Sequence, residues 1–149
     1  MIEITDSPSI AQLRRELKAL GDELEQGKAV RAGLVAAIKP VKPEAKSLAR
    51  KDTGDMAQAI GHRSLSKRAK QRLGIASSDE ALLVGPNRKV NGRYQGAKGR
   101  WNEFGTTRNG KKIMKARPFM APALQAHEGG LEARFYAGLS KFLARRGKK

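Results

Sequence analysis

The chain has 149 residues, enough for about one domain with one modest hydrophobic core. It has no cysteine, which excludes disulfides, thiolate nucleophiles and thiolate metal sites and is compatible with a reducing compartment. The net charge of +17 is large for this length and predicts attraction to polyanions or to acidic protein surfaces.

Residues 1–50 are expected to form a helical arm. Between Ile10 and Leu24 apolar residues recur at steps of three and four, which places them on one stripe of a helix. Such a stripe fits packing on the chain's own domain, and it also fits helix pairing between subunits. Gly27 is expected to interrupt this helix, and Pro40 and Pro43 are expected to disrupt its continuation.

Residues 51–117 are expected to form strands and loops. The alternation from Met56 to Ile60 suits a short strand, and the apolar run from Ala81 to Pro86, closed by Gly-Pro, suits a second strand. Asn91-Gly92 and Asn109-Gly110 are favourable corners of tight hairpins, because Asn and Gly accept the positive φ of a type I′ turn. This part of the chain therefore predicts a small antiparallel sheet.

Residues 118–149 are expected to return to helix. Pro122 fits a first helical turn, and an apolar stripe follows from Leu131 to Leu143, with a bend or restart at Gly129-Gly130. The predicted fold class is α+β, as one domain over residues 1–149. In it, a helical N-terminal arm precedes a small antiparallel sheet with a basic hairpin, and a C-terminal helix packs on the sheet.

Targeting and membrane signals are not found in the sequence. The first residues lack a basic segment followed by an apolar run, and no stretch approaches the roughly 18 apolar residues of a membrane span. The expectation is a chain that is not exported, has no membrane partner and stays in the cytoplasm.

Catalytic signatures are weak. Gly105 to Lys111 fits phosphate-loop spacing, but Lys112 follows where a hydroxyl should hold magnesium. His62 and His127 are far apart and lack zinc-site spacing, and no Gly-x-Ser-x-Gly elbow occurs. We therefore expect no enzymatic activity, no catalytic or metal-binding residues and no cofactor.

A basic surface is the most prominent charge feature. It is expected to face either acidic partner proteins or DNA, and Glu103 is the one acidic residue in its sequence range. Its residues are Arg88, Lys89, Arg93, Lys98, Arg100, Arg108, Lys111, Lys112 and Lys115. No element suited to reading bases accompanies it, so any DNA contact would be non-specific. A free nucleic-acid-binding protein is the alternative function, and a toxin-like or nuclease domain is a second rival.

Four ordered motifs connect this chain to a known family. Thr53-Gly54-Asp55-Met56-x-x-x-Ile60 and Leu83-Val84-Gly85 come first, followed by Trp101-Asn-Glu-Phe-Gly-Thr106 and Ala116-Arg-Pro-Phe-Met-Ala-Pro-Ala123. Together they resemble the pattern of the tail-completion or neck proteins of long-tailed bacteriophages. The chain departs from that pattern in having Arg50-Lys51-Asp52 where a proline is usual, Met56 for Leu, and Arg100-Trp101 for Tyr-Ala.

The resemblance implies a structural protein of the virion neck without enzymatic activity. It implies a homo-oligomeric, hexameric ring that joins the head-side connector or adaptor to the tail terminator or tail tube. The protein would be found in the virion and, during assembly, in the host cytoplasm. The motif residues expected to act as scaffolding are Thr53, Gly54, Trp101, Glu103, Phe104, Gly105, Thr106, Arg117, Pro118, Phe119 and Pro122.

The sequence also suggests roles for some of these motif residues. Phe104 and Phe119 are expected to anchor the core, and Gly105 to allow a turn that a β-carbon would hinder. Glu103 is expected to pair with Arg117 across the hairpin; a catalytic role for these two residues is the alternative.

Overall fold

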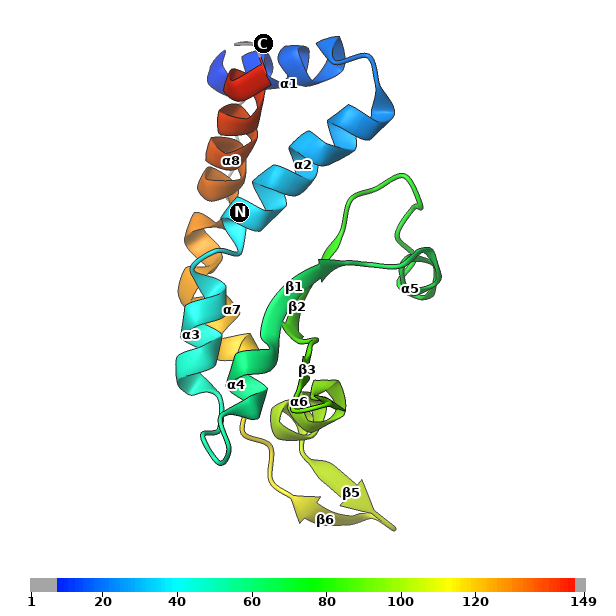
Figure 1. Cartoon of the computed structure of the whole chain (residues 1–149), viewed down its shortest axis with the longest axis vertical. Coiled ribbons are helices and arrows are strands. Elements are labelled where there is room, and N and C mark those ends of the chain that lie inside the picture. Colours follow the sequence, from blue (N-terminus) through cyan, green and yellow to red (C-terminus); the bar gives the residue numbers. More distant parts are fainter. Residues whose placement is uncertain (1–7, 147–149) are drawn as a thin grey trace. The chain divides into compact units, whose positions relative to one another are not determined.

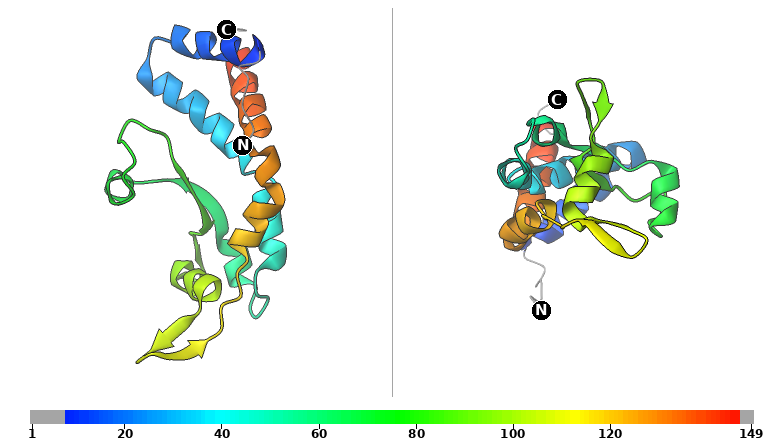
Figure 2. Two further views of the ribbon diagram at one scale, coloured as in Figure 1. Left: turned by 180° about the vertical axis from the view of Figure 1, so that it is seen from behind. Right: turned by 90° about the horizontal axis from the view of Figure 1, so that it is seen from below.

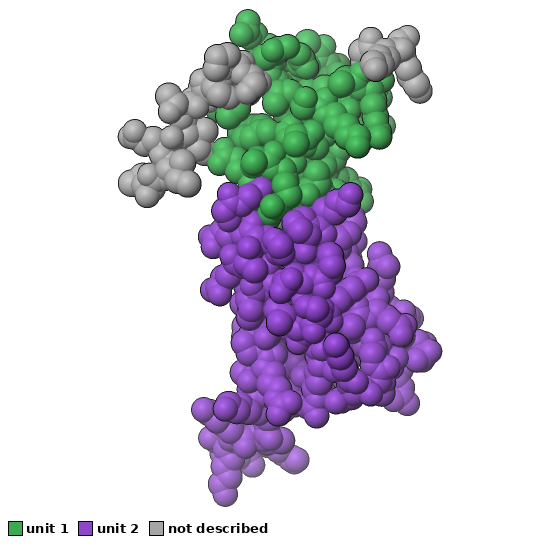
Figure 3. Space-filling model, turned by 90° about the vertical axis from the view of Figure 1, so that its left-hand side faces the viewer, with its two compact units in different colours: residues 1–37, 65–81, 131–149 green, residues 38–64, 82–130 purple. Residues whose placement is uncertain are grey.

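The computed structural model describes residues 8–146, and the chain divides into two compact units (Figure 3). The first unit comprises residues 1–37, 65–81 and 131–149, and the second comprises residues 38–64 and 82–130. These boundaries differ from the expected segments 1–50, 51–117 and 118–149. The ends of the expected arm and C-terminal helix, residues 1–7 and 147–149, lie outside the described residues.

The first unit is helical. Its core contains Ala29, Leu139 and Leu143, with half-buried leucines and aromatics packed around them. Its elements are α1 (Pro8–Ala19), α2 (Glu23–Ala37), α5 (Lys67–Arg72) and α8 (Leu131–Arg146), and α8 packs along α2 (Figure 1). The expected helical arm is confirmed, but its interruption is not at Gly27, which lies inside α2. The chain turns at Gly21 instead, with a left-handed φ of 64°.

Small residues allow α2 and α8 to approach closely. A β-carbon on Gly138 would lie 2.4 Å from the β-carbon of Ala36 and 3.0 Å from the carbonyl oxygen of Ala32. A β-carbon on Gly33 would lie 2.7 Å from the ring of Phe135. Because these distances are shorter than van der Waals contact, the two glycines set the spacing of the helix pair.

The second unit combines helices with short antiparallel strands. Its strands pair as β1–β2, β3–β4 and β5–β6, each a two-stranded sheet. The helices are α3 (Val41–Leu48), α4 (Asp55–Ala59), α6 (Gly96–Phe104) and α7 (Met120–His127), with a 3₁₀ turn at Glu128–Gly130. The strands are β1 (Ile60–Ser64), β2 (Leu82–Pro86), β3 (Lys89–Val90), β4 (Arg93–Tyr94), β5 (Thr106–Arg108) and β6 (Lys111–Met114). The predicted α+β class is confirmed.

Both expected hairpin corners are confirmed. Asn91 and Asn109 have φ of 51° and 50°, and each is followed by a glycine with φ of 75°. Positive φ at both central residues is the requirement of a type I′ turn. The second corner closes the β5–β6 hairpin, which extends beyond α6 in both views of Figure 2.

Two expectations about secondary structure are wrong. The segment predicted as a strand from Met56 is helix α4 up to Ala59, and β1 begins only at Ile60. Gly54, with φ of 75°, starts this helical turn, which buries Met56 and Ala59, three residues apart. The C-terminal region does not form one helix on the sheet: the bend expected at Gly129-Gly130 divides it, and α7 packs on α3 while α8 packs on α2.

Between residues 8 and 146, no helix has the length and apolar character that crossing a bilayer requires.

Candidate functional site

The side chain of Glu103 organises the centre of the second unit. Its carboxylate accepts the backbone N–H groups of Phe119 at 2.9 Å, Met120 at 3.0 Å and Ala121 at 3.0 Å. These groups begin α7, where the first N–H groups of a helix have no partner within the helix and the dipole favours negative charge. Glu103 is therefore a capping residue supplied from α6, sixteen to eighteen residues earlier in the chain.

The expected pair between Glu103 and Arg117 is not formed. Among the described residues Glu103 has no ion pair, and the side chain of Arg117 is exposed, as is Pro118. The backbone N–H of Arg117 instead donates to the carbonyl oxygen of Asn102 at 2.7 Å. The carboxylate prefers the three N–H donors because they are fixed by the start of α7, whereas an exposed arginine would have to be ordered.

Asn102 is a buried polar residue that the sequence interpretation missed. It is 5% exposed, and its side-chain amide donates to the carbonyl oxygen of Lys98 at 2.8 Å. The same amide lies 3.7 Å from the sulfur of Met56 in α4. The Thr-Gly motif and the Trp-Asn-Glu-Phe-Gly-Thr motif are thus in contact. In the sequence, the only signal for Asn102 was its position between Trp101 and Glu103, two residues already chosen as motif residues.

Backbone geometry explains why glycine occupies motif positions 54 and 105. Gly54 begins α4, and the hydroxyl of Thr53 beside it accepts the N–H of Asp55 at 3.4 Å. Gly105 ends α6 with φ of 74°, and a β-carbon there would lie 2.6 Å from the carbonyl oxygen of Met114. The predicted role of Gly105 in a turn that a β-carbon would hinder is confirmed, and Thr106 follows it as the first residue of β5.

The two phenylalanines expected in the core differ. Phe119 is 1% exposed and is one of the largest fully buried side chains, so this prediction is confirmed. Phe104 is 77% exposed, so the prediction for it is wrong. Pro122 lies in the first turn of α7, as expected, next to the buried Ala123.

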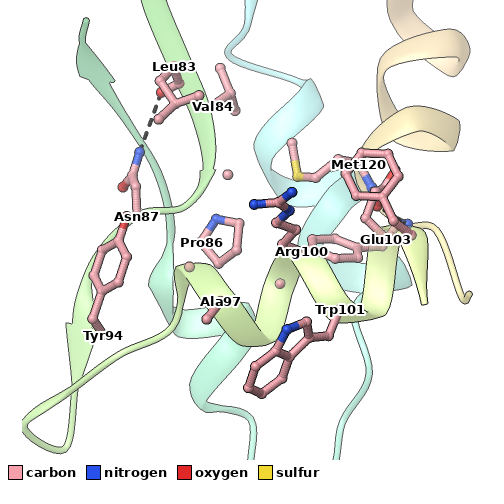
Figure 4. A pocket seen from close by; sticks show the side chains of 15 residues that line it. Leu83, Val84, Pro86, Asn87, Tyr94, Ala97, Arg100, Trp101, Glu103 and Met120 are labelled. Atoms are coloured by element: carbon pink, nitrogen blue, oxygen red, sulfur yellow. Dashed lines mark hydrogen bonds between the residues drawn. The ribbon is translucent and has the colours of Figure 1, made fainter. Parts of the chain in front are cut away.

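An apolar hollow of about 710 Å³ opens beside these motifs. In Figure 4 the side chains of Leu83, Tyr94 and Trp101 lie around it, and Arg100 lies between Pro86 and Met120. Tyr94 and Trp101 are each 51% exposed. We call this the apolar hollow; its lining residues are Leu83, Val84, Gly85, Pro86, Asn87, Tyr94, Gly96, Ala97, Gly99, Arg100, Trp101, Glu103, Phe104, Phe119 and Met120.

The predicted basic residues all lie in the second unit, but on several elements. The first three lie at the β3–β4 hairpin, two lie on α6, and the rest lie on or just after β5–β6. All are exposed except Lys98, which is half-buried. In chain order they are Arg88, Lys89, Arg93, Lys98, Arg100, Arg108, Lys111, Lys112 and Lys115.

A second group of basic side chains surrounds Arg88. The guanidinium of Arg88 lies over Gly61, where a β-carbon would come within 2.7 Å of it. Arg88 lines a hollow of about 370 Å³ together with Lys39, Lys42 and Lys46, which we call the basic hollow. The three lysines were not among the candidate site residues chosen from the sequence. Their close spacing along the chain, just before and within α3, is the signal that could have found them.

Among residues 8–146 no three His, Cys, Asp or Glu side chains gather in a way that could hold a metal ion. The Nδ1 atom of His62 lies 3.1 Å from the ammonium of Lys42, and His127 ends α7.

No family model, curated protein or solved structure matches this chain.

Proposed function

We propose that the protein is a structural subunit of the neck of a tailed bacteriophage, where copies form a ring between the head-side connector and the tail. The proposal rests on the ordered motifs of residues 53–123 and on their resemblance to tail-completion proteins. The observation that carries it is the Glu103 carboxylate, whose three backbone N–H bonds account for the spacing of the two strongest motifs.

The capping geometry supports a scaffolding role for the motif residues. Glu103, Gly105 and Phe119 hold α6, β5–β6 and α7 together by a cap, a tight turn and a buried ring. A glutamate that accepts three N–H bonds is committed to structure, since its lone pairs are directed at the helix start. This arrangement supports the structural role of Glu103 over a catalytic one.

The exposed apolar side chains support assembly into a larger particle. Phe104, Trp101 and Tyr94 are half or more exposed, and they lie at one hollow. Contiguous exposed apolar groups, especially beside charged ones, mark contact surfaces between proteins. A subunit that is surrounded by other proteins in a phage neck would bury such a surface against them.

The test of this function is the composition of purified phage particles from the strain that carries the gene. We expect the chain in the particles, and we expect filled heads and separate tails to accumulate when the gene is disrupted. Complete, infectious particles made without the chain would contradict the proposal.

Non-specific DNA binding is the second candidate function, and the basic hollow favours it. Lys39, Lys42, Lys46 and Arg88 gather four cations around one concavity, a geometry suited to a phosphate group. Anisotropy of labelled duplex DNA at physiological salt tests it. Binding that is lost when Lys39 and Lys42 are changed to Glu supports this function, and no binding to the wild-type protein contradicts it.

A further inference from the structure

We propose that the β5–β6 hairpin of one copy docks into an acidic hollow on the first unit of a second copy. The basic hairpin is defined as residues 106–115. The acidic hollow is lined by Leu17, Glu23, Leu24, Gln26, Gly27, Val30, Ser78, Asp79 and Glu80. The inference rests on the proposed ring and names the contact that would build it.

The basic hairpin places like charges against one another. Arg108 pairs directly with Lys111 across the two strands, and Lys112 is the next residue of β6. Like charges directly opposite in an antiparallel pair destabilise it. In the described part of the chain no carboxylate forms an ion pair with Arg108, Lys111, Lys112 or Lys115. An acidic surface from outside the unit would remove this repulsion.

The acidic hollow has the matching charge. It has a volume of about 880 Å³ and is lined by the carboxylate residues Glu23, Asp79 and Glu80, with no basic residue in its lining. A β-carbon on Gly27 would lie 3.1 Å from a carboxylate oxygen of Glu80, so the glycine leaves room for that group. In a chain with a net charge of +17, such a surface stands out.

A buried lysine holds one wall of the acidic hollow in place. Lys70 is 8% exposed, and its ammonium donates to the backbone carbonyl oxygens of Ser77 and Asp79. These bonds fix the loop that leads into Glu80. The lysine charge is directed at these carbonyl groups and not at the carboxylates of the hollow.

Both partners also present one exposed aliphatic side chain. Ile113 of the hairpin is 65% exposed, and Leu24 at the hollow is 66% exposed. An interface with an apolar centre and a charged rim gives both affinity and register. Because the hairpin and the hollow are different surfaces, the contact is head to tail, a type of contact that forms a ring when its rotation closes and an open filament when it does not.

The test uses reciprocal charge reversal. Variant one carries Lys111→Glu and Lys112→Glu, and variant two carries Asp79→Lys and Glu80→Lys. In either variant alone, the hairpin and the hollow carry charges of the same sign at every contact between copies. The self-association constant measured by sedimentation velocity is therefore expected to fall at least about tenfold. Mixed in equal amounts, the two variants are complementary at every contact and are expected to restore association in alternating order.

Control variants separate this contact from net charge. Lys141→Glu with Arg145→Glu matches variant one, and Glu128→Lys with Glu132→Lys matches variant two; all four residues are exposed. These controls are expected to associate as the wild type does. Circular dichroism and thermal unfolding of every variant establish that each is folded.

Three results would overturn the inference. Rings that form unchanged in both variants would refute the contact while leaving the proposed ring intact. Failure of the mixture to associate, with both variants folded, would show that the charges do not meet between copies. A wild-type protein that never self-associates would contradict both the contact and the proposed ring.

Discussion

The carboxylate of Glu103 accepts the backbone N–H of Phe119 at 2.9 Å, and this bond connects the last turn of α6 to the residue that precedes α7. Phe119 has no side-chain cap of its own, so the helix start depends on a residue from another element. The ring of the same Phe119 is buried, which fixes the position of the N–H group that Glu103 meets.

Replacing Glu103 by Ala is expected to lower the free energy of unfolding by about 1.5 to 3 kcal/mol. The change removes the charged acceptor of three N–H groups at the start of α7; loss of a helix cap costs up to about 2 kcal/mol, and more is expected where the lost bonds are to a charged group. Glu103→Gln is expected to lose less, because the amide oxygen still accepts. Urea denaturation measures both, with the exposed Glu128→Ala as a control near zero. Equal stability of Glu103→Ala and wild type would contradict the capping role.

The two phenylalanines of the motifs are expected to respond oppositely to truncation. Phe119→Ala removes a ring that is 1% exposed and is expected to cost about 3 to 5 kcal/mol of stability. Phe104→Ala removes a ring that is 77% exposed and is expected to change stability by less than about 0.5 kcal/mol. Thermal unfolding of both variants checks this. A large loss of stability in Phe104→Ala would place that ring in the core after all.

The α2–α8 contact predicts a cost for adding one methyl group. In an exposed helix Gly→Ala is favourable by about 1 kcal/mol, but at Gly138 the new β-carbon meets Ala36 and a backbone oxygen. Overpacking costs about 1 to 3 kcal/mol, so Gly138→Ala is expected to be destabilising overall. The control is Gly129→Ala, whose β-carbon would have no neighbour within 4 Å. Stabilisation by Gly138→Ala, measured by denaturation, would show that the helices are farther apart.

Glu25 is expected to make stability depend on pH. A hydrogen bond from Lys28 and the charge of Arg146 hold the pKa of Glu25 below its ordinary value, against the opposing effect of burial. As pH falls, the carboxyl of Glu25 is therefore protonated in the unfolded chain before it is protonated in the folded one. Its contribution to the free energy of unfolding is fully present above the ordinary pKa and is lost as pH falls through the lowered pKa.

The measurement is the difference in unfolding free energy between wild type and Glu25→Gln at a series of pH values. We expect the difference to stay constant from neutral pH down to the ordinary carboxyl range and to shrink below it. The exposed Glu132→Gln serves as the comparison. A difference that grows toward acid pH would reverse the assigned sign.

Local rules predicted much of this fold. The hairpin corners at Asn91-Gly92 and Asn109-Gly110 formed because positive φ is a property of two residues. The arm and the C-terminal stripe followed from helical periodicity. The segment from Met56 to Ile60 was predicted as a strand because alternation over five residues does not distinguish a helical turn from a strand. Gly54, at the N-cap of α4, starts a helix there instead.

The features that the sequence did not predict depend on tertiary contact. Helix α6 contains Gly99, a poor helix former, because a β-carbon there would lie 2.1 Å from the ring of Pro86. The partners of Glu103 are backbone N–H groups, which every residue but proline has, so no side-chain pattern indicates them. The exposure of Phe104 could not be predicted either, since apolar residues also occur on surfaces.

Copies of this chain are proposed to assemble into a ring. Native mass spectrometry of the purified protein over a range of concentrations, with electron microscopy of the largest species, tests it directly. A closed ring with cyclic symmetry is expected for the wild type. A single monomeric species at every concentration and salt would contradict it.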